Sequence, residues 1–272
     1  MSVTFRRFGI AAGTVFFKYR NLLFPVVLVL LLLTVRPSVM LHHPGLDQFL
    51  GRGGFVVALV GELVRIATIG FDYIDRGGKR KQVSASRLVH RGMYGLTRNP
   101  MYVGNLMIVT GVVMVSGAPL AYLTVIPFFL FVYHAIILAE EEFLRTKFGP
   151  EYEAYCASVP RFFPSCRGAG RAFTDMQFNF RRPFKQDLST ITWVALVLTA
   201  MPIWRTSLLQ GWAATRPLAW RTAWAELGIL TLYGLLVLLK KGKSPLFYTA
   251  VERAQARALR NSKEATRDGK DL

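Results

Sequence analysis

The chain has 272 residues, of which 52% are apolar and 18% charged, and its formal net charge is +18. Soluble domains carry about 25% charged residues, so this composition argues against a soluble nucleic-acid-binding protein despite the basic charge. The apolar content excludes intrinsic disorder, and two cysteines, Cys156 and Cys166, are too few for a disulfide-stapled scaffold. We therefore predict an all-α fold, a polytopic bundle of membrane helices.

Six apolar stretches predict about six transmembrane helices. They are residues 22–35, 53–74, 100–116, 120–139, 191–204 and 222–239. A helix needs roughly 17–25 residues to cross about 30 Å of hydrocarbon, and the first and fifth stretches are shorter than that. We expect these two helices to extend into their flanks or to pack at a tilt. Polar residues 18–21 interrupt any signal-peptide core, so the first helix should remain in the mature protein.

Basic residues are distributed unevenly among the predicted loops. Segments 1–20, 74–99, 139–190 and 240–272 hold 28 Lys and Arg, whereas 36–52 and 204–221 hold 5. Cytoplasmic loops carry the excess of basic residues, so the first set is predicted to be cytoplasmic, with both termini inside. Short loops without targeting signals favour a bacterial cytoplasmic membrane, where the basic segments would meet anionic lipid headgroups.

Composition also divides the chain into four parts. Residues 1–74 are predicted to form an N-terminal transmembrane hairpin, and 75–164 a core that holds the third and fourth spans. Residues 165–190 are a basic connector, and 191–272 are an extra transmembrane hairpin with a basic tail. We expect this last hairpin to be peripheral to the chemistry, because the polar motifs described next end by residue 164.

The third and fourth spans are joined by the tight turn 117–119, which makes them antiparallel neighbours. Their other ends must therefore meet, and this brings residues 98–102 close to Glu140 and Glu141. Acidic residues at a helix C-terminus oppose the helix dipole. We expect either that the fourth helix continues to about Phe148 or that a cation binds beside the carboxylates.

Several polar residues around this point have both a structural and a functional interpretation. Asn99 and Pro100 are suited to begin a helix, with Asn99 capping free amides. His134 and Glu141 share one helix face, and ionisable groups at membrane depth are candidates for function. Glu62 and Arg65 are three residues apart and favour a structural ion pair. No metal site is expected, because no cysteine or carboxylate cluster surrounds the histidines.

The polar segments carry a family resemblance. The first, residues 88–104, reads LVxxGxYxxxRNPMYxG, and the second, residues 140–155, reads EExxLxxxFGxEYxxY, followed by Val159, Arg161 and Pro164. In order and spacing this pattern resembles the superfamily of isoprenylcysteine carboxyl methyltransferases and phospholipid N-methyltransferases. Membrane sterol reductases, which bind NADPH, share part of the first segment but not the Glu pair. A non-enzymatic transport or assembly subunit is a third possibility.

The resemblance implies an integral membrane enzyme that uses S-adenosylmethionine at the cytoplasmic face and methylates a lipid or lipidated acceptor. The family's cofactor-binding stretches match Gly92, Tyr94, Arg98, Asn99, Pro100, Tyr102, Gly104, Glu140, Glu141, Tyr152 and Tyr155. The candidate catalytic residues are Arg161, Glu141 and His134. An acceptor carboxylate would need a cation such as Arg161 to orient it. An acceptor amine would need a base, either His134 or one of the residues 140–142.

Overall fold

The computed structural model describes residues 3–39, 42–71, 87–165 and 169–249. Within these ranges the chain is helical and contains no strand, which confirms the all-α prediction. The helices, in chain order, are α1 Val3–Thr34, α2 Pro44–Phe71, η3 Gly92–Gly95, α3 Pro100–Ser116, α4 Pro119–Phe148, α5 Pro150–Ser158, α6 Ala169–Phe173, α7 Arg181–Gln210 and α8 Trp212–Lys241. Cys166 and the basic tail from residue 250 lie outside the described residues.

Each of the six predicted spans falls within or largely within a helix, but not all of these helices have the length of a span. In the described residues, α2, α4, α7 and α8 are long and apolar enough to cross a membrane. The helix α1 adds a fifth span if its two parts, bent by 89° around Pro25, are counted as one. The remaining apolar helix, α3, has only 17 residues, so the structure supports four or five spans rather than six by this measure. The orientation in the membrane stays a prediction.

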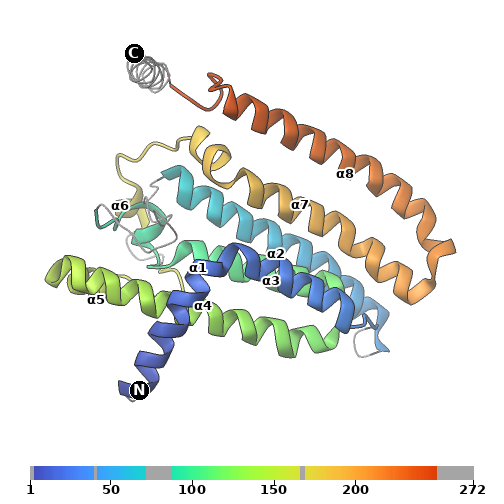
Figure 1. Cartoon of the computed structure of the whole chain (residues 1–272), viewed down its shortest axis with the longest axis horizontal. Helices are drawn as coiled ribbons and strands as arrows, with labels where there is room; N and C mark the ends of the chain where they lie inside the picture. The colour runs from blue at the N-terminus through green and yellow to red at the C-terminus, as the bar shows by residue number, and fades with distance from the viewer. Residues whose placement is uncertain (1–2, 40–41, 72–86, 166–168, 250–272) are drawn as a thin grey trace, which may run out of the picture.

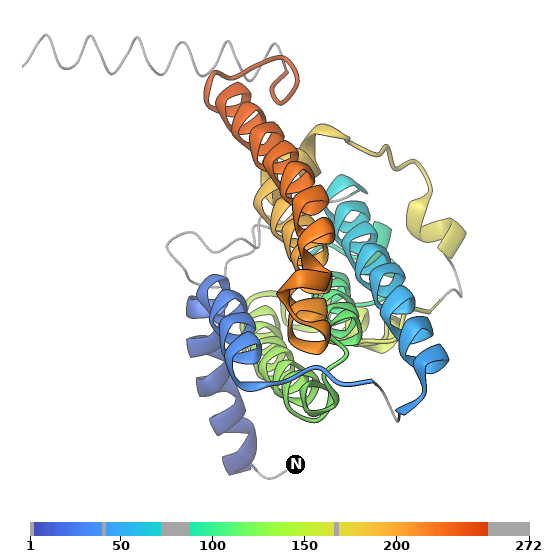
Figure 2. The ribbon, with the colours of Figure 1, turned by 90° about the vertical axis from the view of Figure 1, so that its right-hand side faces the viewer.

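The long helices form two packed groups that share α3 (Figures 1 and 2). The helix α2 packs along α3, and α7 runs beside α2 and contacts both of them. On the other side α1 packs against α4, which is the antiparallel neighbour of α3. The helix α8 packs mainly on α7, at the edge of the molecule in Figure 1, and only Thr215 of this helix is buried. The polar segments η3, α5 and α6 gather at the end of the bundle where α3 begins and α4 ends.

Glycines let α2 and α3 approach until their backbones touch. A Cβ atom placed on Gly61 would lie 2.6 Å from the carbonyl oxygen of Gly104, and one placed on Gly104 would lie 2.7 Å from that of Gly61. Gly54 and Gly111 form a second contact of this kind two turns away. Small residues are the usual means of close helix packing in membranes. Gly104, matched to a cofactor stretch by the resemblance, therefore faces α2 in the structure.

We predict that Gly61→Ala destabilises the protein. The added methyl group must push the two helices apart, and overpacking of this kind costs about 1–3 kcal/mol. Gly228→Ala on α8 is the matched control, because a Cβ there has no neighbouring atom within 4 Å. Thermal unfolding in detergent checks both variants. An equal change in melting temperature for the two would contradict the proposed contact.

Candidate active site

The α3–α4 hairpin brings the predicted polar residues together. Gly117 ends α3 in the left-handed conformation (φ 60°) and allows the tight turn into α4. At the opposite end the Tyr102 hydroxyl donates a hydrogen bond of 2.8 Å to Glu140 Oε1. Arg98 Nη1 lies 3.1 Å from Glu141 Oε1. The predicted meeting of the α3 start with the Glu pair is therefore confirmed. Of the two explanations offered for acidic residues near the end of α4, the structure shows the first, because the helix continues to Phe148.

Glu141 is the centre of a buried ion cluster. Its carboxylate is 5% exposed and is bound by two arginines, Arg98 from the start of α3 and Arg161 from the segment after α5. Arg161 Nε donates a 3.0 Å hydrogen bond to Oε1, and a second guanidinium nitrogen of Arg161 bonds Oε2. A buried carboxylate requires such partners, because desolvation otherwise costs several kcal/mol. Two cations against one anion leave this cluster positive.

The main chain of Arg161 is tied to the start of α3 as well. Asn99 Nδ2 donates to the Arg161 carbonyl oxygen at 3.0 Å, and Thr97 Oγ1 lies 3.2 Å from the same oxygen. The Arg98 amide donates to the Pro160 carbonyl oxygen at 2.8 Å. The expectation that the Asn99 side chain caps α3 is wrong, because the side chain makes no bond to the helix amides and reaches across to Arg161 instead. These bonds fix two segments that are 60 residues apart in the chain.

The aromatic residues of this region divide into two groups. Tyr152 and Tyr155 on α5 pack in an apolar cluster with Leu144, and the Tyr155 hydroxyl donates to the Tyr94 carbonyl oxygen at 2.8 Å. They therefore support the η3 loop, which begins at Gly92 with a φ of 61°. Tyr94 and Tyr102, in contrast, line the main cavity of the described structure.

Two ionisable groups outside the spanning helices have shifted pKa values. The hydrogen bond to Glu141 raises the pKa of the Arg161 guanidinium, so this side chain stays protonated. Burial, and then the nearby Glu141 carboxylate, raise the pKa of the Tyr152 phenol. Tyr152 is therefore neutral at physiological pH, and the charge of the cluster comes from Glu141 and its two arginines.

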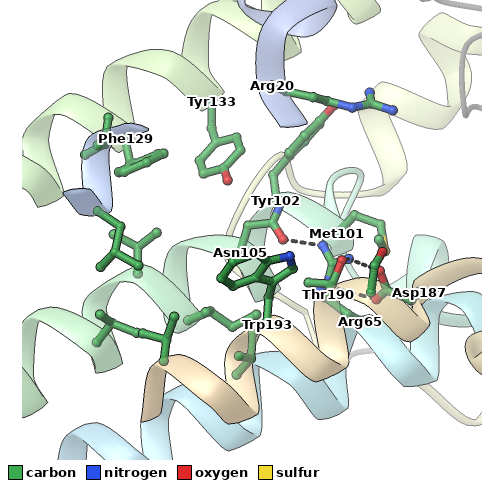
Figure 3. Close-up of a pocket in the computed structure, with 18 of the residues that line it drawn as sticks. Arg20, Arg65, Met101, Tyr102, Asn105, Phe129, Tyr133, Asp187, Thr190 and Trp193 are labelled. Atoms are coloured by element: carbon green, nitrogen blue, oxygen red, sulfur yellow. Dashed lines mark hydrogen bonds and ion pairs between the residues drawn. The ribbon is translucent and has the colours of Figure 1, made fainter. Parts of the chain in front are cut away.

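A cavity of about 650 Å³ lies between α1, α2, α3, α4 and α7 (Figure 3). Its polar end is lined by Tyr94, Asn99, Tyr102 and Glu140, all from the motif segments, and also by Arg20. The rest of its wall is mainly apolar. The apolar residues include Leu28, Leu31, Val109, Val112, Phe129 and Val197. Pockets of 300–1,000 Å³ with a few convergent polar groups are typical of small-molecule sites.

One wall of this cavity is a buried ion pair that the sequence did not reveal. Arg65 Nε on α2 donates a 3.1 Å hydrogen bond to Asp187 Oδ2 on α7, and a second bond joins the two side chains. Arg65 also bonds Asn105 of α3 (Figure 3). The predicted Glu62–Arg65 pair is present, but at 3.7 Å it is the longer contact. The available signal was that Asp187 is the only acidic residue between Asp175 and Glu226.

The helix α7 is consequently part of the candidate site. Asp187, Thr190, Trp193 and Val197 on this helix line the cavity, and α7 packs on both α2 and α3. The helix begins at Arg181, about ten residues before the predicted span, which places Asp187 opposite Arg65. The expectation that the last hairpin, 191–272, is peripheral does not hold for its first helix, α7, which lines the cavity with Trp193, Val194 and Val197. It remains an expectation for α8.

The other predicted residues do not line the cavity. They are Gly92, Arg98, Pro100, Gly104, His134, Glu141, Tyr152, Tyr155 and Arg161. His134 is half-buried on α4 and makes no hydrogen bond to the described residues. Glu142 points to the surface, where it pairs with Arg6 at 2.6 Å. Pro100 is fully buried at the first position of α3. Among the described residues no group of three His, Cys, Asp or Glu side chains is placed to hold a metal ion.

We predict that Asp187→Asn lowers the free energy of unfolding by about 3–5 kcal/mol, the cost of leaving a buried ionic partner uncompensated. Both side chains of the pair are under 10% exposed. Glu153→Gln is the control, because the Glu153–Arg145 pair is exposed and contributes at most about 1 kcal/mol. Denaturant unfolding in detergent measures both. Equal stability of Asp187→Asn and the parent chain would show that α7 is not held through this pair.

Part of the chain is similar to known proteins. Residues 48–151, from α2 to the start of α5, match the family model described as phospholipid methyltransferase. The chain is 35% identical over 77 residues to the cobalt-zinc-cadmium resistance protein CzcN of Cupriavidus metallidurans, covering 28% of this chain and 35% of that protein. It is 29% identical over 126 residues to the nickel-cobalt-cadmium resistance protein NccN of Alcaligenes xylosoxydans xylosoxydans, covering 45% of this chain and 55% of that protein.

The chain thus matches between 35% and 55% of the length of these relatives. No solved structure matches it significantly. The family match contains α3, α4, the Glu pair and Arg65, and it ends before Arg161 and α7. Residues 48–151 carry the phospholipid methyltransferase pattern, which confirms the superfamily resemblance read from the sequence.

Proposed function

We propose that this protein is an S-adenosylmethionine-dependent methyltransferase whose acceptor is a lipid or lipidated molecule that enters from the bilayer. One observation carries the proposal. A single cavity joins a polar end, built by the residues of the family pattern, to an apolar channel between spanning helices. The family match supports a membrane methyltransferase acting on lipid-type substrates. The cytoplasmic side of the bacterial inner membrane is the proposed location of the polar end.

The groups at the polar end suit S-adenosylmethionine, which has a sulfonium, an ammonium, a carboxylate and an adenine. The Glu140 carboxylate is a counter-charge for the cationic groups, and the rings of Tyr94 and Tyr102 suit the adenine. Arg98 does not itself line the cavity, but it precedes Asn99, which does. Its buried Nε has no hydrogen-bond partner among the described residues and is a candidate donor to the cofactor carboxylate. When bound, the cofactor supplies an electrophilic methyl group.

The protein's own contribution is positioning and electrostatics, which suffice for an in-line displacement. Glu141 holds Arg98 and Arg161 together, and the Arg161 carbonyl holds Asn99. Arg161 is a proposed orienting cation for an acceptor carboxylate, since its side chain is still 31% exposed. For an acceptor amine the proposed base is His134 or a carboxylate of the Glu pair. The nucleophile is a carboxylate oxygen in the first case and an amine nitrogen in the second.

The apolar part of the cavity suits a hydrocarbon chain. Leu28 and Leu31 on α1, Val109 and Val112 on α3 and Val197 on α7 line it. Because three separate helices form this wall, an acyl or isoprenoid tail bound there remains inside the bundle while its head reaches Glu140 and Tyr102. A water-soluble acceptor would leave this apolar surface unused.

The two relatives are named as metal resistance proteins. The part of this chain that the structure describes has no group of three His, Cys, Asp or Glu side chains that could hold a metal ion. Methyl transfer is proposed from the residues that line the cavity and from the family match. Thermal unfolding of the purified protein tests the cofactor. S-adenosylmethionine should raise the melting temperature while NADPH does not, and the reverse result would favour a reductase.

We predict that Glu140→Gln weakens S-adenosylmethionine binding by about 1–3 kcal/mol, because it removes a charged hydrogen-bonding group from the cavity wall. Glu142→Gln is the matched control, since this neighbouring carboxylate faces Arg6 at the surface. Calorimetry measures both affinities. Unchanged affinity in Glu140→Gln, or equal losses in the two variants, would refute the cofactor position.

We predict that Val112→Phe lowers turnover of a long-chain acceptor about tenfold or more, because the ring fills the apolar part of the cavity. The affinity for S-adenosylmethionine should stay within about twofold of the parent, since Val112 is remote from the motif residues. Leu227→Phe on the exposed surface of α8 is the control. Normal turnover in Val112→Phe would place the acceptor elsewhere.

A further inference from the structure

A second cleft, which shares only two lining residues with the proposed active site, lies between the first turns of α7 and the last turns of α8. Its volume is about 420 Å³. Among the described residues, its wall contains three lysines, two tyrosines and no acidic residue. The lining is Gln186, Leu188, Ser189, Tyr233, Val237, Lys240, Lys241, Lys243 and Tyr248. Asp187, the nearest acidic residue in the chain, is buried against Arg65 and does not line this cleft.

The end of α8 is held against the first turns of α7, while Lys241 and Lys243 remain exposed at the cleft. Lys240 Nζ donates a 2.5 Å hydrogen bond to the Lys185 carbonyl oxygen, and Lys185 Nζ lies 4.2 Å above the Tyr248 ring. After the helix the chain reverses at Lys243, whose φ of 53° is unusual for a residue with a side chain. Phe247 is 2% exposed and anchors the returning segment. Specific contacts between α7 and the segment after α8 therefore define the shape of the cleft.

The lysine charges have no anionic partner in the described part of the chain. Neither Lys241 nor Lys243 forms an ion pair with a described residue. Lysines at a helix C-terminus favour the helix dipole, which explains Lys240 and Lys241 but not Lys243 or the two tyrosines. Three ammonium groups with hydroxyl donors from serine and tyrosine match a phosphate, whose oxygens accept several hydrogen bonds.

The surroundings favour a lipid as the source of that phosphate. The cleft is at the end of two membrane-spanning helices, on the same side of the bundle as the other polar segments (Figure 1). Leu235 and Leu238, on the same turns of α8, are more than half exposed, and a spanning helix presents such side chains to acyl chains. A lipid can thus place its head in the cleft and its tails along α8.

We propose that the cleft between α7 and α8 binds the phosphate headgroup of an anionic phospholipid. This lipid is a bound partner and not the methyl acceptor, because the cleft shares only Gln186 and Ser189 with the lining of the main cavity. Its binding would fix α8 to α7 and, through Asp187, keep the wall of the active site in place. The proposal does not depend on methyl transfer.

Native mass spectrometry of the purified full chain in detergent tests this site. Phosphatidylglycerol, phosphatidylcholine with the same acyl chains and inorganic phosphate are added separately. We expect one phosphatidylglycerol to be retained per chain, with phosphatidylcholine binding far more weakly. In the double variant Lys241→Gln/Lys243→Gln, affinity for phosphatidylglycerol should fall about thirtyfold, the effect of two lysines near an anionic headgroup.

The double variant Lys18→Gln/Lys147→Gln is the control, because it removes two exposed lysines from α1 and α4, away from the cleft. Its affinity should stay within about twofold of the parent. Equal losses in the two double variants would mean diffuse attraction and would overturn the proposal. Equal retention of phosphatidylcholine would overturn it too. If inorganic phosphate bound as tightly as phosphatidylglycerol, the proposal that the phosphate belongs to a lipid would be wrong.

Discussion

The candidate site depends first on the burial of Glu141. A carboxylate at this depth of the bundle requires cations, and Arg98 and Arg161 supply them from segments on either side of the α3–α4 hairpin. The same contact holds the Arg161 main chain where Asn99 can bond it. The first turn of α3 is thereby fixed in relation to the end of α4. Glu140, one residue away on α4, is left facing the cavity, so two adjacent carboxylates have different tasks.

The second constraint is the close approach of α2 and α3 at their glycines. With the backbones of Gly61 and Gly104 in contact, Arg65 on the next turn of α2 reaches both α3 and α7. Its bonds to Asn105 and Asp187 bring α7 onto the core. The cavity is the space that remains between this assembly and the α1–α4 pair (Figure 3). The helices α2 and α3, which lie in the family match, and α7, which lies outside it, thus line the cavity together.

Local patterns in the sequence were sufficient for much of the fold. Apolar stretches located the long helices, and the turn at Gly117 predicted the meeting of Tyr102 with Glu140, which the structure confirms. The rest depended on contacts between distant segments. The side chain of Asn99 bonds a carbonyl 62 residues away rather than its own helix, and Asp187 pairs with an arginine 122 residues away. No local pattern contains such information, although an isolated acidic residue in a spanning helix indicates that a buried partner exists.

We propose that the protein transfers a methyl group to a lipid-type acceptor bound in this cavity. The most direct measurement is incubation of the purified protein with S-adenosylmethionine carrying a radiolabelled methyl group and a total extract of bacterial membrane lipids. The account predicts label in the organic phase that depends on the protein, together with formation of S-adenosylhomocysteine. Label that stays in the aqueous phase, with no S-adenosylhomocysteine formed by a folded protein, would contradict it.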